Sequence, residues 1–310
     1  MKKEEKFPLV SIGVPIVKSD FLEKCIKCIL NQTYSNIEVI IINNASDHQE
    51  ADAIEAILTQ FSDKRIRYFR NDLQISITEN WNRTLFLSKG IFFAILCDDD
   101  YWEPDFIETM ILLAIKYHRV NIFHCRCLII NEKDEPINLS PICPEYEDVA
   151  DFIYYRIKGF RMQYLSDFFV RAYAIKKIDG FLKVPDGWGS DDLTWFRLSL
   201  IGGIVYSSKI LYHYRETQVS ITSTMEIKNK ILATEIFVNQ INDILGIINE
   251  SVTIHPILPN LILKEIKDFK RRKLISYRAE YLKKKFMLNY FLYVIVLFVL
   301  KLRYKITKHY

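Results

Sequence analysis

The stretch PLVSIGVPIVKSDFLEKCIKCILNQTYSNIEVIIINNAS (residues 8–46) places an amphipathic segment between two apolar runs. The runs, LVSIGVPIV and IEVIIIN, are rich in β-branched residues, whereas FLEKCIKCIL repeats its apolar residues at helical spacing. Two parallel strands need a crossover of this kind, because each strand must start at the same edge of the sheet. The stretch therefore predicts a strand–helix–strand unit of a parallel sheet.

The same alternation continues to about residue 130. RIRYF, IFFAILC and NIFHCRCLII are further strand-like runs, and PDFIETMILLAIKYH is a further helix-like segment. Strands that are apolar throughout belong to sheets whose two faces are both covered by helices. We therefore predict an α/β fold built on a Rossmann-like, mostly parallel sheet.

An acidic triplet, Asp98, Asp99 and Asp100, follows the fourth apolar run. Adjacent carboxylates repel one another, and burial at the edge of a core raises the cost of keeping them ionised, so a positive group is expected to offset them. Ligands of open α/β sheets bind beyond the carboxyl ends of the strands. This rule places the triplet on the same edge as Asn43 and Asn44, which follow another strand, and predicts a binding site there.

The second half of the chain is less regular. Residues 132–160 contain three prolines and an acidic patch, which predicts a loop-rich insertion. Residues 162–181 follow a strand-to-helix pattern, and Asp191 and Asp192 then fall where a helix should begin, a position that favours carboxylates. Helical periodicity dominates residues 224–249 and 259–285.

The six cysteines are few for 310 residues, and the opening MKKEEKFP lacks the apolar segment of a cleavable signal. Cys25 and Cys28 lie in a helical pattern, and Cys125 and Cys127 in a strand-like run, without a second pair at zinc spacing. We interpret them as reduced core residues of a cytoplasmic protein.

Three blocks of the chain resemble family-2 glycosyltransferases of the A-type fold. Residues 8–46 are similar to the family's V-S-I-x-x-P strand, its helix ending in Q-T-Y and its strand leading to D-D-G-S. ENWNRTLFLSKGIFFAILCDDDYWEPDF (residues 79–106) resembles its N-x-x-L-x-x-A-x-G segment and D-x-D motif. GSDDLTWFRLSLIGGIVYSSKILYHYR (residues 189–215) is similar to the block with the catalytic carboxylate.

The resemblance covers roughly residues 8–222 and implies a glycosyltransferase of cell-surface polysaccharide synthesis. Such an enzyme moves a sugar from a nucleotide-diphospho-sugar to a hydroxyl acceptor, here a glycan or lipid-linked glycan, with inversion. It implies a catalytic domain over residues 1–222, with a nucleotide-sugar half at about 8–130 and an acceptor half at about 131–222. Residues 223–310 then form a helical C-terminal extension.

The same resemblance assigns the metal site. A hard cation, Mn²⁺ or Mg²⁺, would neutralise the charge that develops on the diphosphate leaving group. Asp99 aligns with the second aspartate of D-x-D and is the first metal ligand, Asp100 is another, and Asp98 lies near the ribose or the metal. Cys97 replaces the family's first aspartate, so Asp98-x-Asp100 remains an alternative motif. His213 is a candidate third metal or phosphate ligand.

The donor pocket and the base are assigned in the same way. Five residues frame the donor: Pro15, Asn43, Asn71, Asn82 and, as a bidentate diphosphate ligand, Arg215. Asn43 replaces an aspartate that reads the base in relatives, although an amide can also read a pyrimidine edge. Asp191 is the catalytic base that takes the proton of the attacking hydroxyl, with Asp192 as the alternative. Asp191 and Asp192 also suit the N-terminus of a helix without any catalytic role. Ser190 replaces a glutamate of the family motif.

The C-terminal segment suggests another partner. From Leu261 to Tyr310 the chain carries fourteen Lys and Arg against three Asp and Glu, while the whole chain is only +4. Residues 286–300 are nearly all apolar, but as a helix they would rise about 22 Å, short of the roughly 30 Å of a bilayer core. This pattern favours a helix on an anionic membrane surface, peripheral at the inner face. A membrane-spanning helix and a buried packing helix remain alternatives.

Other classes of protein fit less well. Residues 286–300, which lie between basic residues, are too apolar for a surface that faces phosphates, so we expect no nucleic acid partner. A metal-dependent nucleotidyltransferase would need a Gly-rich loop with a basic residue after the first strand, which VSIGVPIVKSD lacks. An aspartate-nucleophile phosphatase would carry its aspartates on the first strand rather than the fourth. A catalytically degenerate nucleotide-sugar-binding protein remains an alternative because of Cys97, Asn43 and Ser190.

Overall fold

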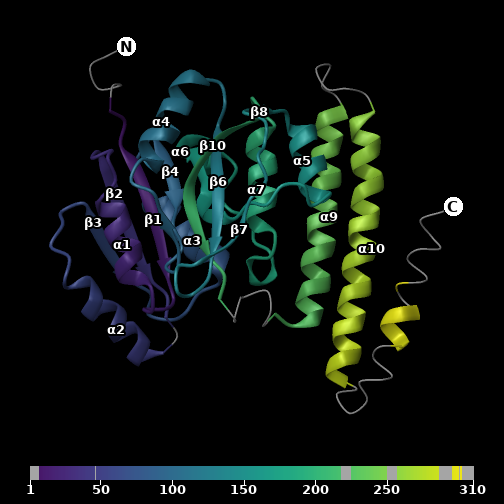
Figure 1. The fold of residues 1–310 in the computed structure, drawn as a ribbon, viewed down its shortest axis with the longest axis horizontal. Coiled ribbons are helices and arrows are strands. Elements are labelled where there is room, and N and C mark those ends of the chain that lie inside the picture. The colour runs from purple at the N-terminus through teal and green to yellow at the C-terminus, as the bar shows by residue number, and fades with distance from the viewer. Residues whose placement is uncertain are drawn as a thin grey trace.

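The computed structural model describes residues 7–45, 47–217, 225–249, 257–285, 295–299 and 301 (Figure 1). Its centre is a ten-stranded sheet in the order β3-β2-β1-β4-β9-β6-β10-β5, with β7 paired to β6 and β8 to β10. The strands are β1 (Val10–Ile16), β2 (Ile37–Asn43), β3 (Ile66–Arg70), β4 (Phe92–Ile95), β5 (Tyr101–Trp102), β6 (Ile122–Ile130), β7 (Pro136–Leu139), β8 (Tyr146–Glu147), β9 (Phe168–Arg171) and β10 (Ile204–Arg215). The helices are α1 (Leu22–Leu30), α2 (His48–Leu58), α3 (Ile77–Leu87), α4 (Phe106–Lys116), α5 (Val149–Ile157), α6 (Ala172–Lys177), α7 (Ser190–Ser199), α9 (Ile227–Asn249) and α10 (Leu258–Lys285).

The sheet is mostly parallel, as the sequence predicts. Strands β3, β2, β1 and β4 are parallel neighbours, with Val10 opposite both Ile37 and Phe92. β9 runs antiparallel to both β4 and β6, so β6 and its parallel partner β10 point the same way as β1 to β4. Six strands therefore end at one edge of the sheet, which is the edge at which α/β sheets bind ligands.

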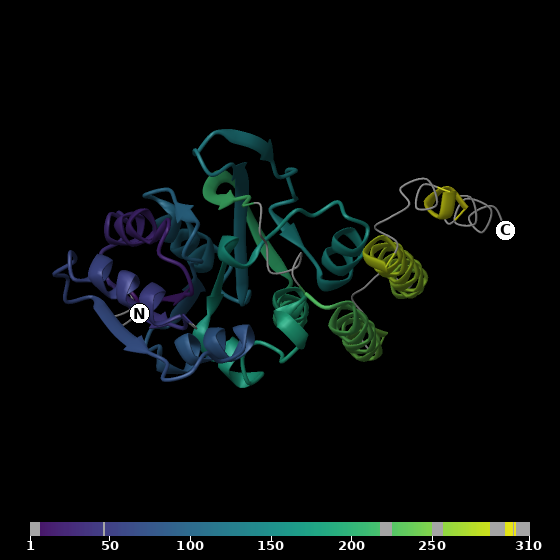
Figure 2. The ribbon, with the colours of Figure 1, turned by 90° about the horizontal axis from the view of Figure 1, so that it is seen from below.

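Helices cover both faces of this sheet (Figure 2). Successive side chains of a strand point to opposite faces, and β4 shows the result. Phe92 and Ala94 join a core cluster with α1 and α4, whereas Phe93 and Ile95 join one with α6 and α7. Burial on both faces explains why the strand sequences are apolar throughout rather than alternating.

The expectation of a loop-rich insertion at residues 132–160 is wrong in part. This segment contains β7, β8 and the helix α5. The Asp148 side chain starts α5 by accepting hydrogen bonds from the backbone N–H groups of Ala150 and Asp151. Such a cap satisfies donors that the first turn leaves open. The prolines precede the helix and do not interrupt it.

The helices α9 and α10 pack side by side, with α9 against α7 and α10 against α5 (Figure 1). Phe237 of α9 lies edge-on to Trp188 at 5.6 Å between ring centres and also faces Phe196 of α7. Ile262 and Ile266 of α10 are buried in the same cluster. The long predicted helices are thus confirmed and share a hydrophobic core with α5 and α7.

The cysteines lie where the sequence predicts. All six are free, and Cys25, Cys125 and Cys127 are buried in the core on the α1 side of the sheet. Burial raises the pKa of the Cys25 thiol well above its usual range. These thiols are core groups with little thiolate character.

One described helix has the length and composition of a membrane span. An 18-residue window within Ile227–Ile248 of α9 has a mean hydropathy of 1.4, and 44% of that window is buried within the protein. The apolar run at 286–300 lies outside the described residues except for 295–299, so the membrane helix predicted there stays a prediction.

Candidate active site

The acidic triplet lies at the carboxyl edge of the sheet, beside the end of β1. Asp98 Oδ2 accepts hydrogen bonds from the backbone N–H groups of Val17 at 2.8 Å and Lys18 at 2.9 Å. The backbone N–H of Asn44 donates to the Ile16 carbonyl at 2.8 Å, so the end of β2 meets the same strand. The predicted edge therefore brings the triplet and Asn44 together.

The three aspartates of the triplet have different surroundings. Asp100 is buried, and its carboxylate accepts from the Tyr212 hydroxyl and from the Arg215 backbone N–H at 2.9 Å. Asp98 is held by β1 as described. The Asp99 carboxylate is partly buried and has no hydrogen-bond or ion-pair partner from another residue in the described chain. Of the three, Asp99 has the side chain most available to a ligand.

Burial weakens the acidity of the whole triplet. Desolvation, with the Asp99 charge as a second cause, raises the pKa of Asp98 to about 7. Desolvation also raises the pKa of Asp99, against the nearby cation of Arg215, and it raises that of Asp100 further. Clustered carboxylates that resist ionisation are the environment in which a bound cation gains most.

The side chain of Arg215 holds the backbone of the triplet. Its buried guanidinium donates from Nε to the Asp99 carbonyl at 2.9 Å, from Nη1 to the Asn131 carbonyl at 2.9 Å and from Nη2 to Asp134 Oδ1 at 2.7 Å. It also lies over the Phe21 ring, 4.0 Å from the ring centre. The structure thus uses the predicted diphosphate ligand to hold the backbone of the triplet in place.

His213 faces a different set of groups. Its Nε2 lies 2.6 Å from Glu103 Oε1, and its ring stacks on Tyr101 at 4.2 Å. Tyr212, the preceding residue of β10, is the one that reaches Asp100, and neighbouring side chains of a strand point to opposite faces. Burial lowers the pKa of His213. The structure therefore pairs this predicted ligand with Glu103.

The predicted donor-pocket residues form a buried amide network after β2 and β3. Asn43 donates from Nδ2 to the Ala51 carbonyl and the Tyr68 hydroxyl, both at 3.1 Å. Asn71 donates to Asn44 Oδ1 at 2.6 Å and accepts from Arg83. These bonds set the shape of the two turns, which face the end of β1.

Pro15 and Asn82 have structural roles as well. Pro15 pairs with Ile42 in β1, beyond the last β4 partner of this strand at Gly13, so its missing N–H interrupts no pairing with β4. Asn82 of α3 closes two hydrogen bonds with the Phe181 backbone, at 2.9 and 2.7 Å. This contact ties α3 to the segment that leads to α7.

Asp191 and Asp192 open α7, as the sequence predicts, and they are not equivalent. Arg156 binds Asp192 through two parallel hydrogen bonds, Nε to Oδ1 at 2.8 Å and Nη2 to Oδ2 at 3.0 Å. Asp191 has no such partner in the described chain, and burial together with the Asp192 charge raises its pKa to about 7. A carboxyl with a pKa near neutrality and a free carboxylate suits a general base.

Both aspartates line a cavity of about 450 Å³ between α7, α9 and α10. Its walls carry the rings of Trp81, Trp188, Phe237 and Phe269 and the cations Arg156 and Lys273. Because α7 leads into β10, which runs toward the carboxyl edge, the start of α7 lies on that same edge (Figure 1). The triplet and this cavity therefore belong to one side of the molecule.

Gly189 allows the chain to enter α7 beside this cavity. Its φ is 71°, and a Cβ at this position would lie 2.8 Å from the Phe237 ring. Only glycine meets both conditions without strain.

The residues that surround the acids of the site were not identified from the sequence. Arg156 and Lys273 come from segments without a motif, and nothing in the local sequence links Arg156 to Asp192 thirty-six residues later. The GWG glycines before Ser190 were the one available signal for the cavity. Within the described residues, no group of three or more His, Cys, Asp or Glu side chains is arranged to hold a metal.

The fold and the edge site define the class of A-type transferases, and comparisons with known proteins support this assignment. Residues 11–175 match the family described as "Glycosyl transferase family 2". This match covers more than half of the chain, and the chain belongs to that family.

Curated relatives match shorter stretches. Glycosyltransferase GlyG of Streptococcus pneumoniae serotype 4 is 27% identical over 171 residues, 55% of this chain and 48% of GlyG. Chondroitin synthase of Pasteurella multocida is 25% identical over 209 residues, 67% of this chain and 20% of that protein. The chain spans less than half the length of either relative.

Solved structures share the fold at low identity. TarS 1-349 of S. aureus, in complex with UDP-GlcNAc, superimposes with a TM-score of 0.62 at 13% identity, over 89% of this chain and 80% of TarS 1-349. The mannosyltransferase PcManGT of Pyrobaculum calidifontis, in complex with GDP-Man and Mn²⁺, gives a TM-score of 0.55 at 13% identity, over 94% of this chain and 84% of that one. The predicted A-type fold is confirmed.

Proposed function

We propose that the protein is a glycosyltransferase that moves a sugar from a nucleotide-diphospho-sugar to a hydroxyl acceptor with inversion. One observation carries the proposal: two carboxylates without partners in the described chain, Asp99 and Asp191, lie on the same edge of the sheet. An inverting transfer needs two groups of this kind, one on the leaving-group side and one on the acceptor side.

On the donor side, Asp99 would hold a divalent cation, Mn²⁺ or Mg²⁺. Its carboxylate offers the hard oxygen ligand that both ions prefer, and waters and phosphate oxygens would fill the remaining coordination positions of a site with few protein ligands. The cation supplies charge neutralisation for the diphosphate as the sugar bond breaks. Arg215 and Tyr212 keep the triplet in position by holding Asp99's backbone and Asp100's side chain.

On the acceptor side, Asp191 would take the proton of the attacking hydroxyl. Arg156 binds Asp192, and its positive charge lowers the pKa of Asp191, which offsets part of the effect of the Asp192 charge. Asp192 is therefore a positioning residue in this proposal, and its own carboxylate is occupied.

The relatives support a nucleotide-diphospho-sugar as the donor, but they do not identify its nucleobase or its sugar. The TarS structure carries UDP-GlcNAc, and the PcManGT structure carries GDP-Man and Mn²⁺. Asn43 has both amide groups engaged, so we infer that backbone groups of the turns after β2 and β3 contribute to base recognition.

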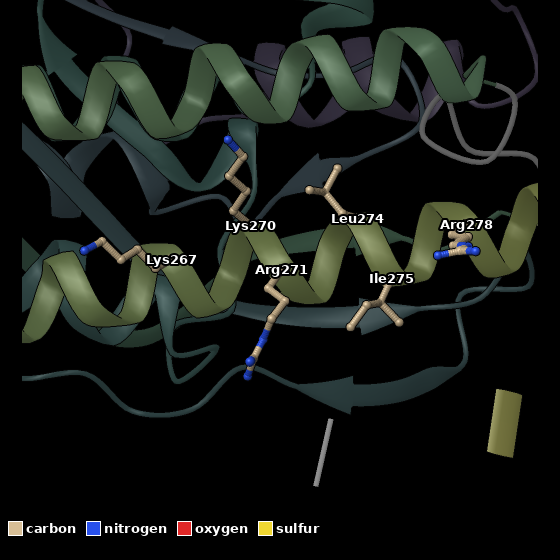
Figure 3. Close-up of a pocket in the computed structure, with 6 residues that line it drawn as sticks. All are labelled: Lys267, Lys270, Arg271, Leu274, Ile275 and Arg278. Carbon is tan, nitrogen blue, oxygen red and sulfur yellow. The ribbon is translucent and has the colours of Figure 1, made fainter. Parts of the chain in front are cut away.

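We propose a glycan or lipid-linked glycan acceptor, used in cell-surface polysaccharide synthesis at the inner face of the membrane. A polysaccharide synthase among the relatives supports the pathway. A cavity of about 330 Å³ on α10 supports a membrane contact, and it is lined by Lys267, Lys270, Arg271, Leu274, Ile275 and Arg278 (Figure 3). Lys270 also pairs with Glu235 and Arg271 with Asp268. Cations beside aliphatic side chains suit an anionic lipid surface.

The first test is calorimetric titration of UDP, GDP, CDP and dTDP into the protein, with and without Mn²⁺. We expect one nucleotide to bind in a way that requires both the metal and Asp99. Asp105→Asn is the matched control, since this half-exposed carboxylate pairs, among the residues that the structure describes, with Lys209 and Thr109. Absence of nucleotide binding under all conditions would sink the donor-site proposal.

A degenerate sugar-nucleotide-binding protein is the second candidate, favoured by the replacement of a family aspartate by Cys97. Release of nucleoside diphosphate from the donor that binds separates the two. Slow hydrolysis that Asp191→Asn abolishes supports the transferase, whereas binding without any turnover supports the binding protein.

A further inference from the structure

The cavity beside Asp191 contains a cation that the proposed reaction does not use. Lys273 of α10 lines it together with Trp188 and Phe269. Its Nζ lies 5.1 Å from the centre of the Trp188 ring and 5.5 Å from that of Phe269. The side chain is thus directed at the aromatic wall of the cavity.

Lys273 differs from the cations around it in its lack of a carboxylate partner. Arg156 is bound to Asp192, Lys230 to Glu280 at 2.8 Å and Arg272 to Glu265 at 2.9 Å. Among the residues that the structure describes, the ammonium group of Lys273 has ring contacts and no ion pair. A partly buried cation of this kind is incompletely compensated.

The charges around Lys273 also indicate an incompletely compensated cation. Burial is the largest cause that lowers the pKa of Lys273, and the neighbouring cations Arg156 and Arg272 lower it further. Asp192 raises this pKa, but Arg156 already binds that carboxylate. This part of the cavity therefore favours an incoming anion.

The rest of the cavity suits a sugar. Trp81 and Trp188 present flat ring surfaces, on which the C–H face of a pyranose can pack, and Asp191 provides the base for a hydroxyl. The remaining acid of the lining, Asp186, is exposed and accepts from Asn229 Nδ2 at 3.0 Å.

We propose that the acceptor carries an anionic group, a carboxylate or a phosphate, which pairs with Lys273 while a neighbouring sugar packs on Trp188. This inference rests on the proposed transferase function and adds the chemical class of the acceptor. It also gives α10 a direct role in acceptor selection.

The test is a ligand-observed NMR titration of matched methyl glycosides into the full chain. The panel contains the gluco, galacto and N-acetylglucosamine configurations, each neutral, as the uronic acid and as the 6-phosphate. The variants are wild type, Lys273→Gln, Lys273→Arg and, as a matched control, Lys264→Gln, an exposed lysine of the same helix.

We expect at least one anionic glycoside to bind roughly ten-fold more tightly than its neutral counterpart, because a charge-assisted pair forms in a partly dry site. Lys273→Gln should remove this preference and leave neutral binding unchanged. Lys273→Arg and Lys264→Gln should keep it. The uronic acid and phosphate arms identify which anion the site prefers.

Equal binding of neutral and anionic members, or a preference that survives Lys273→Gln, would overturn the proposal. Thermal melting of each variant separates loss of the cation from loss of the fold, and Lys273→Arg keeps the charge if Lys273→Gln does not fold. Failure of nucleotide binding would instead contradict the transferase function, and the anion preference would stand without it.

Discussion

The two carboxylate regions of this protein are built in different ways. The triplet is held by bonds from the ends of strands, since β1 binds Asp98 and β10 binds Asp100. Asp191 instead faces a cavity whose far wall comes from α9 and α10. The comparison teaches that the proposed donor side rests on contacts at the strand ends, whereas the proposed acceptor side also needs α9 and α10, which follow the last strand of the sheet.

The largest expected effect is on the donor side. Asp99→Ala removes the free carboxylate, and we expect metal-dependent nucleotide binding to disappear and transfer to fall by about 10³-fold or more, since a metal contributes several kcal/mol to such a step. Calorimetry with Mn²⁺ and a product-release assay measure the two effects. Retained metal dependence would show that Asp98 or Asp100 is the ligand.

Asp191→Asn tests the acceptor side. We expect transfer to fall by about 10²-fold through loss of the general base, with nucleotide affinity unchanged because the donor side is separate. Steady-state kinetics and nucleotide titration of the same preparation provide the comparison. If Asp192→Asn lowered transfer more than Asp191→Asn does, after correction for lost stability, then Asp192 would be the base and Asp191 the positioning residue.

Arg215→Met should affect stability more than chemistry. The substitution removes three hydrogen bonds to Asp99, Asn131 and Asp134 and leaves the triplet without its buried cation, which costs about 3 kcal/mol. Urea unfolding measures this loss, with Arg70→Met, a more exposed arginine, as the control. A stable variant with weakened diphosphate binding would support a ligand role for Arg215.

The smallest effect is a shift in pH dependence. The pKa of Asp191 is raised to about 7, and a base must be ionised to act, so transfer should rise with pH through about 7 and level off above it. Arg156 lowers this pKa by its charge, so Arg156→Met should move the rise to higher pH. A pH–rate profile that this substitution leaves in place would count against Asp191 as the base.

Much of the fold could be predicted because its cause is local. The apolar runs at β1, β2, β4 and β6 are buried on both faces, so their composition alone indicates a covered parallel sheet. The error at residues 132–160 has a local cause too: prolines and acids suggested a loop, while the Asp148 cap that starts α5 was not recognised.

The site was predictable at the level of segments but not of atoms. The position of the triplet after a strand follows from the sequence, whereas the difference between Asp99 and Asp100 depends on Tyr212 and Arg215 more than a hundred residues away. His213 illustrates the same limit, since strand pairing directs it to Glu103.

The sequence by itself determined the strand–helix alternation, the edge that carries the aspartates and the helix whose first turn holds Asp191, because periodicity and residue type act within a few residues. Only the tertiary structure decided which carboxylates stay free and where Lys273 lies. Hydrogen bonds and ion pairs between distant segments depend on the packing of the whole chain, and these contacts distinguish Asp99 from Asp100 and Asp191 from Asp192.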